Sequence, residues 1–175
     1  PGLADLVSEQ KVDLGVGLNV DGDRLGFVTE TGKALSEEMT LPLVALSRLR
    51  RRPGLTVTNL STSSRVDAVA TLFGQSVLRT AVGETFVIDR GLEEDAVLAG
   101  EGSGGTAPLP ITMTFDALLS LGFVLEEMAR DRVTLSQLAE KVPSRFMHKG
   151  EIRCEPARAY RTLERFESEF ADAMV

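Results

Sequence analysis

Short apolar segments and longer amphipathic segments alternate along residues 55–99, and this alternation limits the fold more than any other feature. Residues 55–58, 76–79 and 96–99 have the pattern of buried strands, whereas 66–73 and 86–94 have helical spacing. A strand–helix alternation favours a mainly parallel sheet with helices packed on its faces. The sequence therefore predicts the α/β class, with a mainly parallel mixed sheet covered by helices on both faces.

Further elements are expected on either side of this region. The hydrophobic spacing predicts helices over 3–10, 39–52, 114–129, 134–142 and 157–173, strands over 12–18 and 27–29, and an extended segment over 146–154. Thr114 and Thr134 are the expected N-caps of their helices. The helix over 39–52 ends in four arginines, which favour the negative end of a helix dipole over a nucleic-acid patch.

The overall charge and the rare residues exclude several classes of function. The net charge of -7 over 175 residues argues against nucleic-acid or anionic-membrane partners. The single histidine, His148, excludes a histidine-based metal site or triad within the chain. A single cysteine, Cys154, forms no internal disulfide, which fits a reducing cytoplasm. The sequence has no signal peptide and no apolar run long enough to span a membrane.

A cluster of oxygen-bearing side chains follows the first expected strand. Asn19, Asp21 and Asp23 alternate, and Arg24 comes next. Such oxygens suit Mg²⁺, but in an extended strand Asn19 and Asp23 would lie about 13 Å apart. They can share one ion only if the chain curls, which Gly22 permits. A solvated turn is the alternative reading, since Asp, Asn and Gly are common turn residues.

A second segment of interest is the glycine-rich stretch over 100–105. It follows the expected strand over 96–99, and ligands of α/β sheets bind beyond the carboxyl ends of the strands. Glu101 would repel a phosphate, whereas Glu101 with Ser103 suits sugar hydroxyls, which both donate and accept hydrogen bonds. A flexible connector is the alternative. The stretch has no Gly-Lys-Ser/Thr and is therefore not a Walker loop.

Taken together, these segments resemble the α-D-phosphohexomutase superfamily of phosphoglucomutases, phosphomannomutases and phosphoglucosamine mutases. Asp13 to Leu25 resembles its metal loop, and Gly100 to Gly105 its sugar-binding loop. Shorter segments between them, Ser61-Thr62-Ser63 and Arg79 to Glu84, also resemble the family. Members of this family move a phosphoryl group between two positions of a hexose, through a phosphorylated serine and a bisphosphorylated intermediate.

The resemblance implies a role for each matching residue. Asn19, Asp21 and Asp23 would surround Mg²⁺, and Arg24 would support that charge cluster as a catalytic residue. Glu101 and Ser103 would hold the sugar hydroxyls of a hexose phosphate, while Gly83 and Glu84 would line the sugar pocket and contribute to selectivity. Phosphoryl transfer depends on such positioning and charge neutralisation more than on covalent help.

Two departures from the family pattern bear on activity. The first metal ligand of the family is aspartate, and Asn19 takes its place, so weaker magnesium binding is expected. The chain also contains no segment resembling the phosphoserine loop or the C-terminal phosphate loop. We therefore expect that this chain alone does not turn over a hexose phosphate.

The resemblance also predicts the domain organisation. Residues 1–38 would be the end of the second family domain, 39–132 the third domain, and 133–175 a linker with the start of the fourth. The expected partners are the remaining domains of the same polypeptide, or a second copy of the chain. The alternative is a truncated, non-catalytic protein that binds a sugar phosphate or another subunit.

Overall fold

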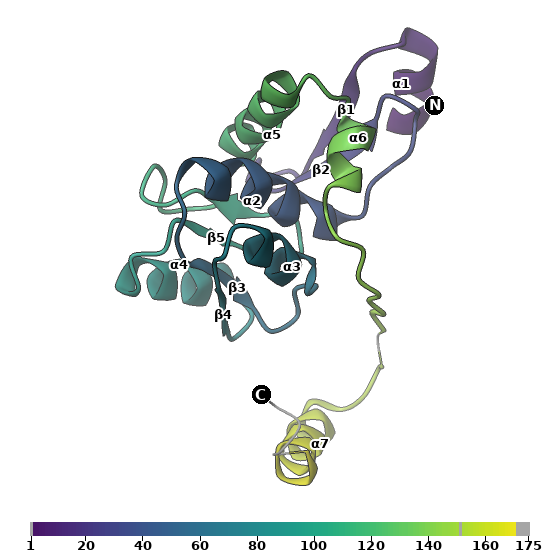
Figure 1. The fold of residues 1–175 in the computed structure, drawn as a ribbon. Helices are drawn as coiled ribbons and strands as arrows, with labels where there is room; N and C mark the ends of the chain where they lie inside the picture. The colour runs from purple at the N-terminus through teal and green to yellow at the C-terminus, as the bar shows by residue number, and fades with distance from the viewer. Residues whose placement is uncertain (1, 151, 171–175) are drawn as a thin grey trace. The chain divides into compact units, whose positions relative to one another are not determined.

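The computed structural model describes residues 2–150 and 152–170, and the chain divides into two units, Pro1–Arg145 and Phe146–Val175. The centre of the first unit is a four-stranded sheet with the order β4-β3-β5-β6 (Figure 1). β3 pairs in parallel with both β4 and β5, and β5 pairs antiparallel with β6. The predicted mainly parallel mixed sheet is confirmed. Its strands are β3 (Thr56–Asn59), β4 (Val77–Thr80), β5 (Leu98–Gly100) and β6 (Thr106–Ala107).

Helices cover both faces of this sheet, as the alternation predicts. Helices α2 (Thr40–Arg51) and α3 (Arg65–Leu72) lie on one face, and α4 (Glu84–Glu93) lies on the other (Figure 1). Successive residues of a strand point to opposite faces. Leu98 accordingly belongs to the core beneath α2, whereas Ala99 belongs to the core beneath α4.

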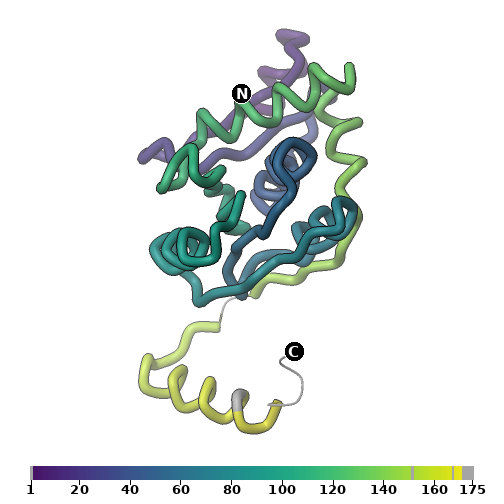
Figure 2. The backbone as a smooth tube through the Cα atoms, turned by 60° about the vertical axis from the view of Figure 1, so that its left-hand side comes forward, coloured from purple at the N-terminus to yellow at the C-terminus, as the bar shows by residue number. Residues whose placement is uncertain are grey.

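Helix α2 is the centre of the larger core. Ten of its twelve residues are buried, because it packs between the sheet, α3 and α5 (Ala117–Asp131), as Figure 2 shows. A helix enclosed in this way loses the usual division into an apolar and a polar face. Its buried polar residues can then find partners only inside the protein, as Thr40 and Arg48 do, whereas Ser47 Oγ has no hydrogen-bond partner among the described residues.

The arginines at the end of α2 make specific contacts with neighbouring elements. The buried Arg48 guanidinium donates to the carbonyls of Val97 and Leu109, and lies 5.9 Å from the Phe123 ring centroid. Burial, followed by the neighbouring cations Arg52 and Arg51, lowers the Arg48 pKa from its usual value. The position of these arginines in the last turn agrees with the prediction, but Arg48 is a buried tie between α2 and the sheet.

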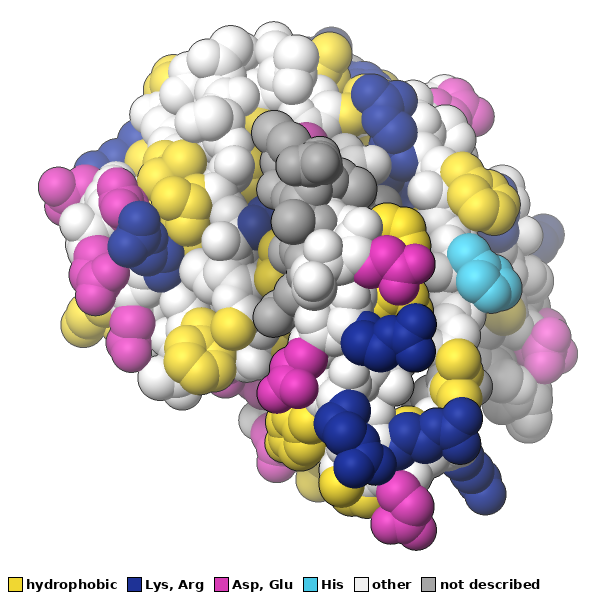
Figure 3. Space-filling model, turned by 90° about the horizontal axis from the view of Figure 1, so that it is seen from below, with side chains coloured by type: hydrophobic (Ala, Val, Ile, Leu, Met, Phe, Trp, Pro, Cys, Tyr) yellow, Lys and Arg dark blue, Asp and Glu magenta, His cyan; other side chains and the backbone are white. Residues whose placement is uncertain are grey.

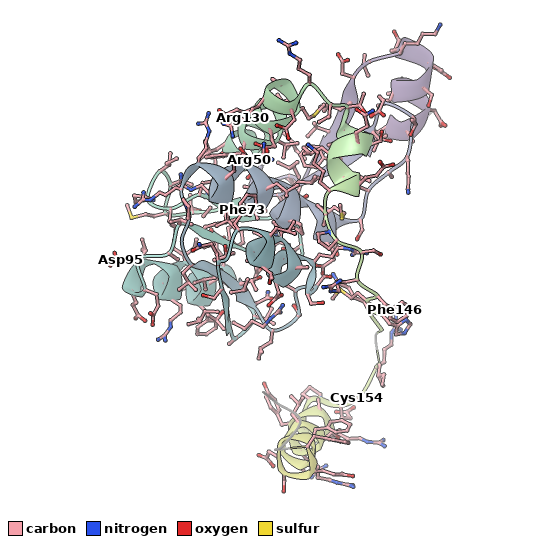
Figure 4. All side chains as sticks on the ribbon, viewed as in Figure 1. Arg50, Phe73, Asp95, Arg130, Phe146 and Cys154 are labelled. Atoms are coloured by element: carbon pink, nitrogen blue, oxygen red, sulfur yellow. The ribbon has the colours of Figure 1, made fainter. Side chains whose placement is uncertain are left out.

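The other arginines of this turn pair with acidic residues of α5. Arg50 Nη1 lies 2.9 Å from Glu127 Oε1 and 2.7 Å from Asp131 Oδ1. Lys141 Nζ approaches the other oxygen of Asp131 at 2.5 Å. Figure 4 labels Arg50 on α2 and Arg130, a second partner of Glu127, on α5. The turn is therefore part of a helix–helix contact.

The N-terminal residues form a helix and an antiparallel hairpin. Helix α1 (Leu3–Gln10) precedes strands β1 (Leu14–Leu18) and β2 (Leu25–Thr29), which pair from Leu14 with Thr29 to Leu18 with Leu25. After the turn at 30–33, with Gly32 at φ 76°, the short 3-10 helix η1 (Glu37–Met39) leads into α2. Leu25 and Phe27 belong to the core around α2, and the predicted domain division at residue 38 stays a prediction.

Two helix starts differ in how well the sequence predicts them. Thr134 caps α6 (Leu135–Glu140) through a capping box with Gln137, as expected. The expectation that Thr114 caps α5 is wrong, because the Asp116 side chain accepts from Leu119 N at 2.8 Å. Aspartate ranks above threonine as an N-cap, and here the cap lies two residues later than expected.

The second unit contains α7 (Pro156–Glu169). Residues 171–173 of the expected helix lie outside the described residues. The expected extended segment over 146–154 has neither helix nor strand at its described positions, and His148 is exposed there, as Figure 3 shows in cyan. Among the described residues, no helix has the length and apolar character needed to cross a membrane.

Candidate functional site

Residues 19–24 form the turn that joins β1 to β2. The chain curls here, which is the condition for Asn19 and Asp23 to approach each other, and Gly22 adopts φ 72° in the left-handed region. Gly22 N donates to Asn19 O at 3.2 Å, and Asn19 N donates to Arg24 O at 3.3 Å. The curl brings the two ends of the motif together.

The Asn19 side chain closes this turn with three hydrogen bonds. Its Oδ1 accepts from the backbone N–H groups of Asp23 and Arg24, at 3.2 and 3.1 Å. Its Nδ2 donates to Asp23 Oδ1. Asp23 Oδ2 lies 4.0 Å from Arg24 Nε, whereas Asp21 is exposed.

The side chains of the turn offer Mg²⁺ two carboxylates, those of Asp21 and Asp23. Within residues 2–150 and 152–170, no three His, Cys, Asp or Glu side chains lie together as a metal site. Asp21 and Asp23 still offer two carboxylates on one short turn, and Mg²⁺ in proteins is commonly held by one or two carboxylates with phosphate and water. The turn therefore fits magnesium as a site that a phosphate group completes.

The glycine-rich loop pairs directly with the end of this turn. Arg24 and Gly105 form an antiparallel β-bridge, and Leu25 N donates to Gly104 O at 3.3 Å. Gly104 has φ 94°, and a Cβ there would lie 2.6 Å from Leu25 O, so only glycine permits this approach. Two segments that lie about eighty residues apart are thus held together by the backbone.

A shallow pocket lies where the two loops meet. Its volume is about 440 Å³, and its lining includes Asn19, Arg24 and Ser103. These are three of the eight residues that the sequence predicts for the site. Glu37 of η1 also lines the pocket, and the sequence analysis did not identify it.

Glu101 is buried behind this pocket and connects three loops. Its Oε1 accepts from Asn59 Nδ2 at 2.7 Å and from Gly83 N at 2.9 Å. Its Oε2 lies 3.4 Å from Ser103 Oγ. One carboxylate oxygen is therefore committed to the fold, and the other faces Ser103.

Asn59, at the carboxyl end of β3, organises the segment that follows it. Its Oδ1 accepts from Ser61 N, Ser61 Oγ and Thr62 Oγ1, at 3.0, 3.0 and 2.8 Å. Arg79 supports the same segment by donating to the carbonyls of Asn59 and Thr62. Asn59 is not among the residues that the sequence predicts for the site, although a polar residue at the end of a buried strand is a usable signal.

Glu38 is a second residue that the sequence analysis missed. It is 3% exposed, and its Oε2 accepts from Ser63 N at 3.0 Å. Gly102 lies so close that a Cβ there would be 2.2 Å from the Glu38 carboxylate oxygens, while Gly102 N donates to Thr62 Oγ1. Glu38 therefore sets the space available to the glycine-rich loop.

Gly83 and Glu84 are neighbours in the chain but make hydrogen bonds to different parts of the molecule. Gly83, at φ 137°, precedes α4 and reaches the site through its N–H to Glu101. The Glu84 carboxylate instead accepts from Thr114 Oγ1 and Phe115 N, at 2.8 and 2.9 Å. It ties α4 to the segment before α5 and is not among the residues that line the pocket of Asn19 and Ser103.

The chain is similar to known proteins in both sequence and fold. The family model for "Phosphoglucomutase/phosphomannomutase, alpha/beta/alpha domain III" matches residues 29–146. A phosphoglucomutase/phosphomannomutase of Thermococcus kodakarensis is 30% identical over 155 residues, which cover 88% of this chain and 34% of that protein. A phosphoglucosamine mutase of Geobacter metallireducens is 33% identical over 141 residues, covering 79% and 31%.

A solved structure of a related protein has the same fold. The crystal structure of a phosphoglucomutase/phosphomannomutase family protein from Burkholderia thailandensis aligns with TM-score 0.70 and 26% identity, over 82% of this chain and 31% of that one. The chain spans about a third of the length of the relatives it matches. It belongs to the phosphoglucomutase/phosphomannomutase family of the α-D-phosphohexomutase superfamily and has the fold of the third family domain.

Proposed function

We propose that this chain is part of a phosphohexomutase that moves a phosphoryl group between the 1 and 6 positions of a hexose phosphate. The observation that carries the proposal is the junction of the two loops. The Arg24–Gly105 bridge holds the acidic turn against the glycine-rich loop, and residues of both line one pocket. A charge-neutralising group and a sugar-binding group on one surface are what phosphoryl transfer on a sugar needs.

The roles proposed for the loop residues follow from their chemistry. Ser103 Oγ and the second oxygen of Glu101 can donate to and accept from sugar hydroxyls, and Gly83 supports Glu101 through its backbone N–H. Arg24, half-exposed at the pocket, would bring positive charge to a phosphate. Glu84 would act on the sugar only indirectly, through the start of α4.

Magnesium is the proposed cofactor. Asp21 and Asp23 would hold the ion, with Asn19 beside them, and the bound ion would neutralise the negative charge of a phosphoryl group. The phosphate would come from a phosphoserine in a part of the polypeptide that this chain does not contain. We expect magnesium binding to be weak when no phosphate is present.

The remaining parts of the active site are proposed to come from further domains of the same polypeptide, with a second copy as the alternative. Exposed apolar residues on the hairpin support such a contact, since Leu18 is 51% exposed and Val20 is fully exposed. A cytoplasmic location and the absence of nucleic-acid and membrane partners remain our proposals. They rest on the acidic charge and on the exposed, unpaired Cys154.

Calorimetric titration with hexose 1- and 6-phosphates in the presence of Mg²⁺ tests the binding part of this proposal. We expect weak binding that Ser103→Ala weakens about fivefold, the effect of losing one hydrogen bond of about 1 kcal/mol. Ser8→Ala, which removes a hydroxyl of α1 that bonds only Ala4 O, is the matched control. Equal binding by the natural chain and Ser103→Ala would contradict the proposed role.

A mutase assay on the 175-residue chain tests the expectation that this chain alone has no activity. The chain is expected to show no turnover, because a phosphoserine loop and a phosphate-binding loop are both required and neither occurs in its sequence. Activity above background would contradict this expectation.

A further inference from the structure

We propose that Asn19 is not a metal ligand but a positioning residue, whose side-chain amide closes the 19–24 turn in place of a cation. The inference rests on the proposed use of magnesium and deepens it. Its basis is the set of three hydrogen bonds that the Asn19 amide makes within the turn. This role differs from the one that the family resemblance implies.

The orientation of the Asn19 amide follows from its neighbours. Its oxygen faces the N–H groups of Asp23 and Arg24, and both of these are donors. Rotating the amide by 180° would set its NH₂ group against two donors and its oxygen against the Asp23 carboxylate. Only the observed orientation satisfies all three neighbouring groups, so the NH₂ group must face Asp23.

The consequence is that the Asn19 oxygen is already in use. A carbonyl oxygen has two lone pairs, and here two backbone N–H groups occupy them. To bind Mg²⁺, this oxygen would have to give up bonds that define the turn. Asp21 and Asp23 are then the only side chains of the turn left as ligands.

The NH₂ group of Asn19 also competes with a cation for Asp23. It donates to Asp23 Oδ1 and so occupies one of the two lone pairs that this oxygen could offer an ion. An aspartate at position 19 could accept hydrogen bonds from the same backbone N–H groups, but it could not donate one to Asp23. Its negative charge would instead repel the Asp23 carboxylate. The turn of this chain is therefore closed without metal, whereas an aspartate there would need a cation to relieve the repulsion.

Magnesium titrations of three proteins test this inference. The natural chain, Asn19→Ala and Asn19→Asp are compared by calorimetry in inorganic phosphate buffer. We expect Asn19→Ala to bind Mg²⁺ at least as tightly as the natural chain, because Asp23 is released while the backbone bonds from Gly22 N to Asn19 O and from Asn19 N to Arg24 O keep the turn in place. Asn19→Asp is expected to bind about tenfold more tightly. Weaker binding by Asn19→Ala would overturn the inference, because it is the result that loss of a ligand gives.

Nuclear magnetic resonance tests the amide contact without any metal. In the natural chain, the NH₂ resonances of Asn19 are expected to move when Asp23→Asn removes the charged acceptor. Asp95→Asn makes the same charge change after α4, at the position labelled in Figure 4, and should leave them unmoved. Unmoved Asn19 resonances in Asp23→Asn would overturn the inference.

The two experiments separate this inference from the proposed function. If even Asn19→Asp binds no Mg²⁺, the proposed magnesium use is wrong, and the resonance measurement alone then decides the role of Asn19. If Mg²⁺ binds but Asn19→Ala weakens it, magnesium use stands and the positioning role is overturned.

Discussion

Three polar side chains with almost no exposed surface set the shape of the site. Asn59, Glu101 and Glu38 are 2%, 5% and 3% exposed, and each accepts from or donates to a different loop. Buried polar groups are tolerated only when they are hydrogen-bonded, so each of these contacts fixes a loop position. The pocket therefore depends on residues that do not line it.

Glu101 offers a test at the residue scale. Glu101→Ala leaves the buried Asn59 Nδ2 and the half-buried Gly83 N without an acceptor, and should lower the free energy of unfolding by about 3 kcal/mol. Glu101→Gln keeps an acceptor oxygen and should cost about 1 kcal/mol. Urea denaturation measures both values.

Glu93→Ala is the control for this pair of variants. It removes an exposed carboxylate of α4 whose ion pair with Arg90 spans 3.5 Å. Exposed ion pairs of this kind contribute little to the free energy of unfolding. Equal losses for Glu101→Ala and Glu93→Ala would show that Glu101 does not hold the loops together.

Which site residues can be read from the sequence depends on how far away their partners lie. The turn at 19–24 was predictable, because Asn19 and Asp23 are four residues apart and Gly22 supplies the bend. Asn59 ends a buried strand, which was a usable signal, but its pairing with Glu101, 42 residues away, was not predictable. The same holds for Glu38 and Ser63, which are 25 residues apart. Sequence reasoning had no access to those pairings, which the packing of the sheet and η1 determines.

At the scale of elements, the α2–α5 contact combines a buried and an accessible carboxylate. Glu127 is fully buried, and burial raises its pKa, opposed mainly by Arg50. Hydrogen bonds from Lys141 and then Arg50 lower the pKa of Asp131 to about 2. The pKa values of these two carboxylates, which lie about one helix turn apart, are therefore shifted in opposite directions.

Asp131 makes the stability of this contact dependent on pH. The pKa of Asp131 is lowered in the folded protein from an ordinary 3.8 to about 2. The contribution of Asp131 to the free energy of unfolding is therefore complete above pH 3.8 and is lost as the pH falls towards 2. Comparing urea midpoints of the natural chain and Asp131→Asn from pH 6 to 2.5 checks this. The natural chain should be more stable at pH 6, and the difference should shrink steadily below pH 4. A difference that stays constant with pH would contradict the assignment.

Regular elements were more predictable than the side chains that connect them. Strands and helices of the first unit were found because burial imposes a period of two or 3.6 residues. The two-residue β6 was not predicted, because Thr106 and Ala107 are too short a segment to show any period. Asp116 caps α5 in place of Thr114, whose hydroxyl instead donates to Glu84, a residue 30 positions away that the sequence pattern does not connect with it.

At the scale of the whole molecule, the two units differ in how they are stabilised. Both core clusters draw their buried residues from positions between Leu25 and Val142. No described side chain of the second unit is buried. The first unit therefore holds the interactions that resist unfolding.

Truncation after Arg145 tests this division. Residues 1–145 should unfold cooperatively, with a free energy within about 0.5 kcal/mol of the full chain, because no core residue is removed. Circular dichroism during urea denaturation measures it. A broad transition, or a loss above about 2 kcal/mol, would show that the second unit contributes to the stability of the first.

The bridge between Arg24 and Gly105 limits how the lengths of two loops can change in evolution. Two β-bridged residues share one register, and shifting one partner by a single position turns its side chain to the opposite face. An insertion in the turn over 19–24 would move Arg24 away from Gly105 unless the glycine-rich loop changed as well. Among descendants of this chain, the lengths of these two distant loops should therefore be inherited as a matched pair.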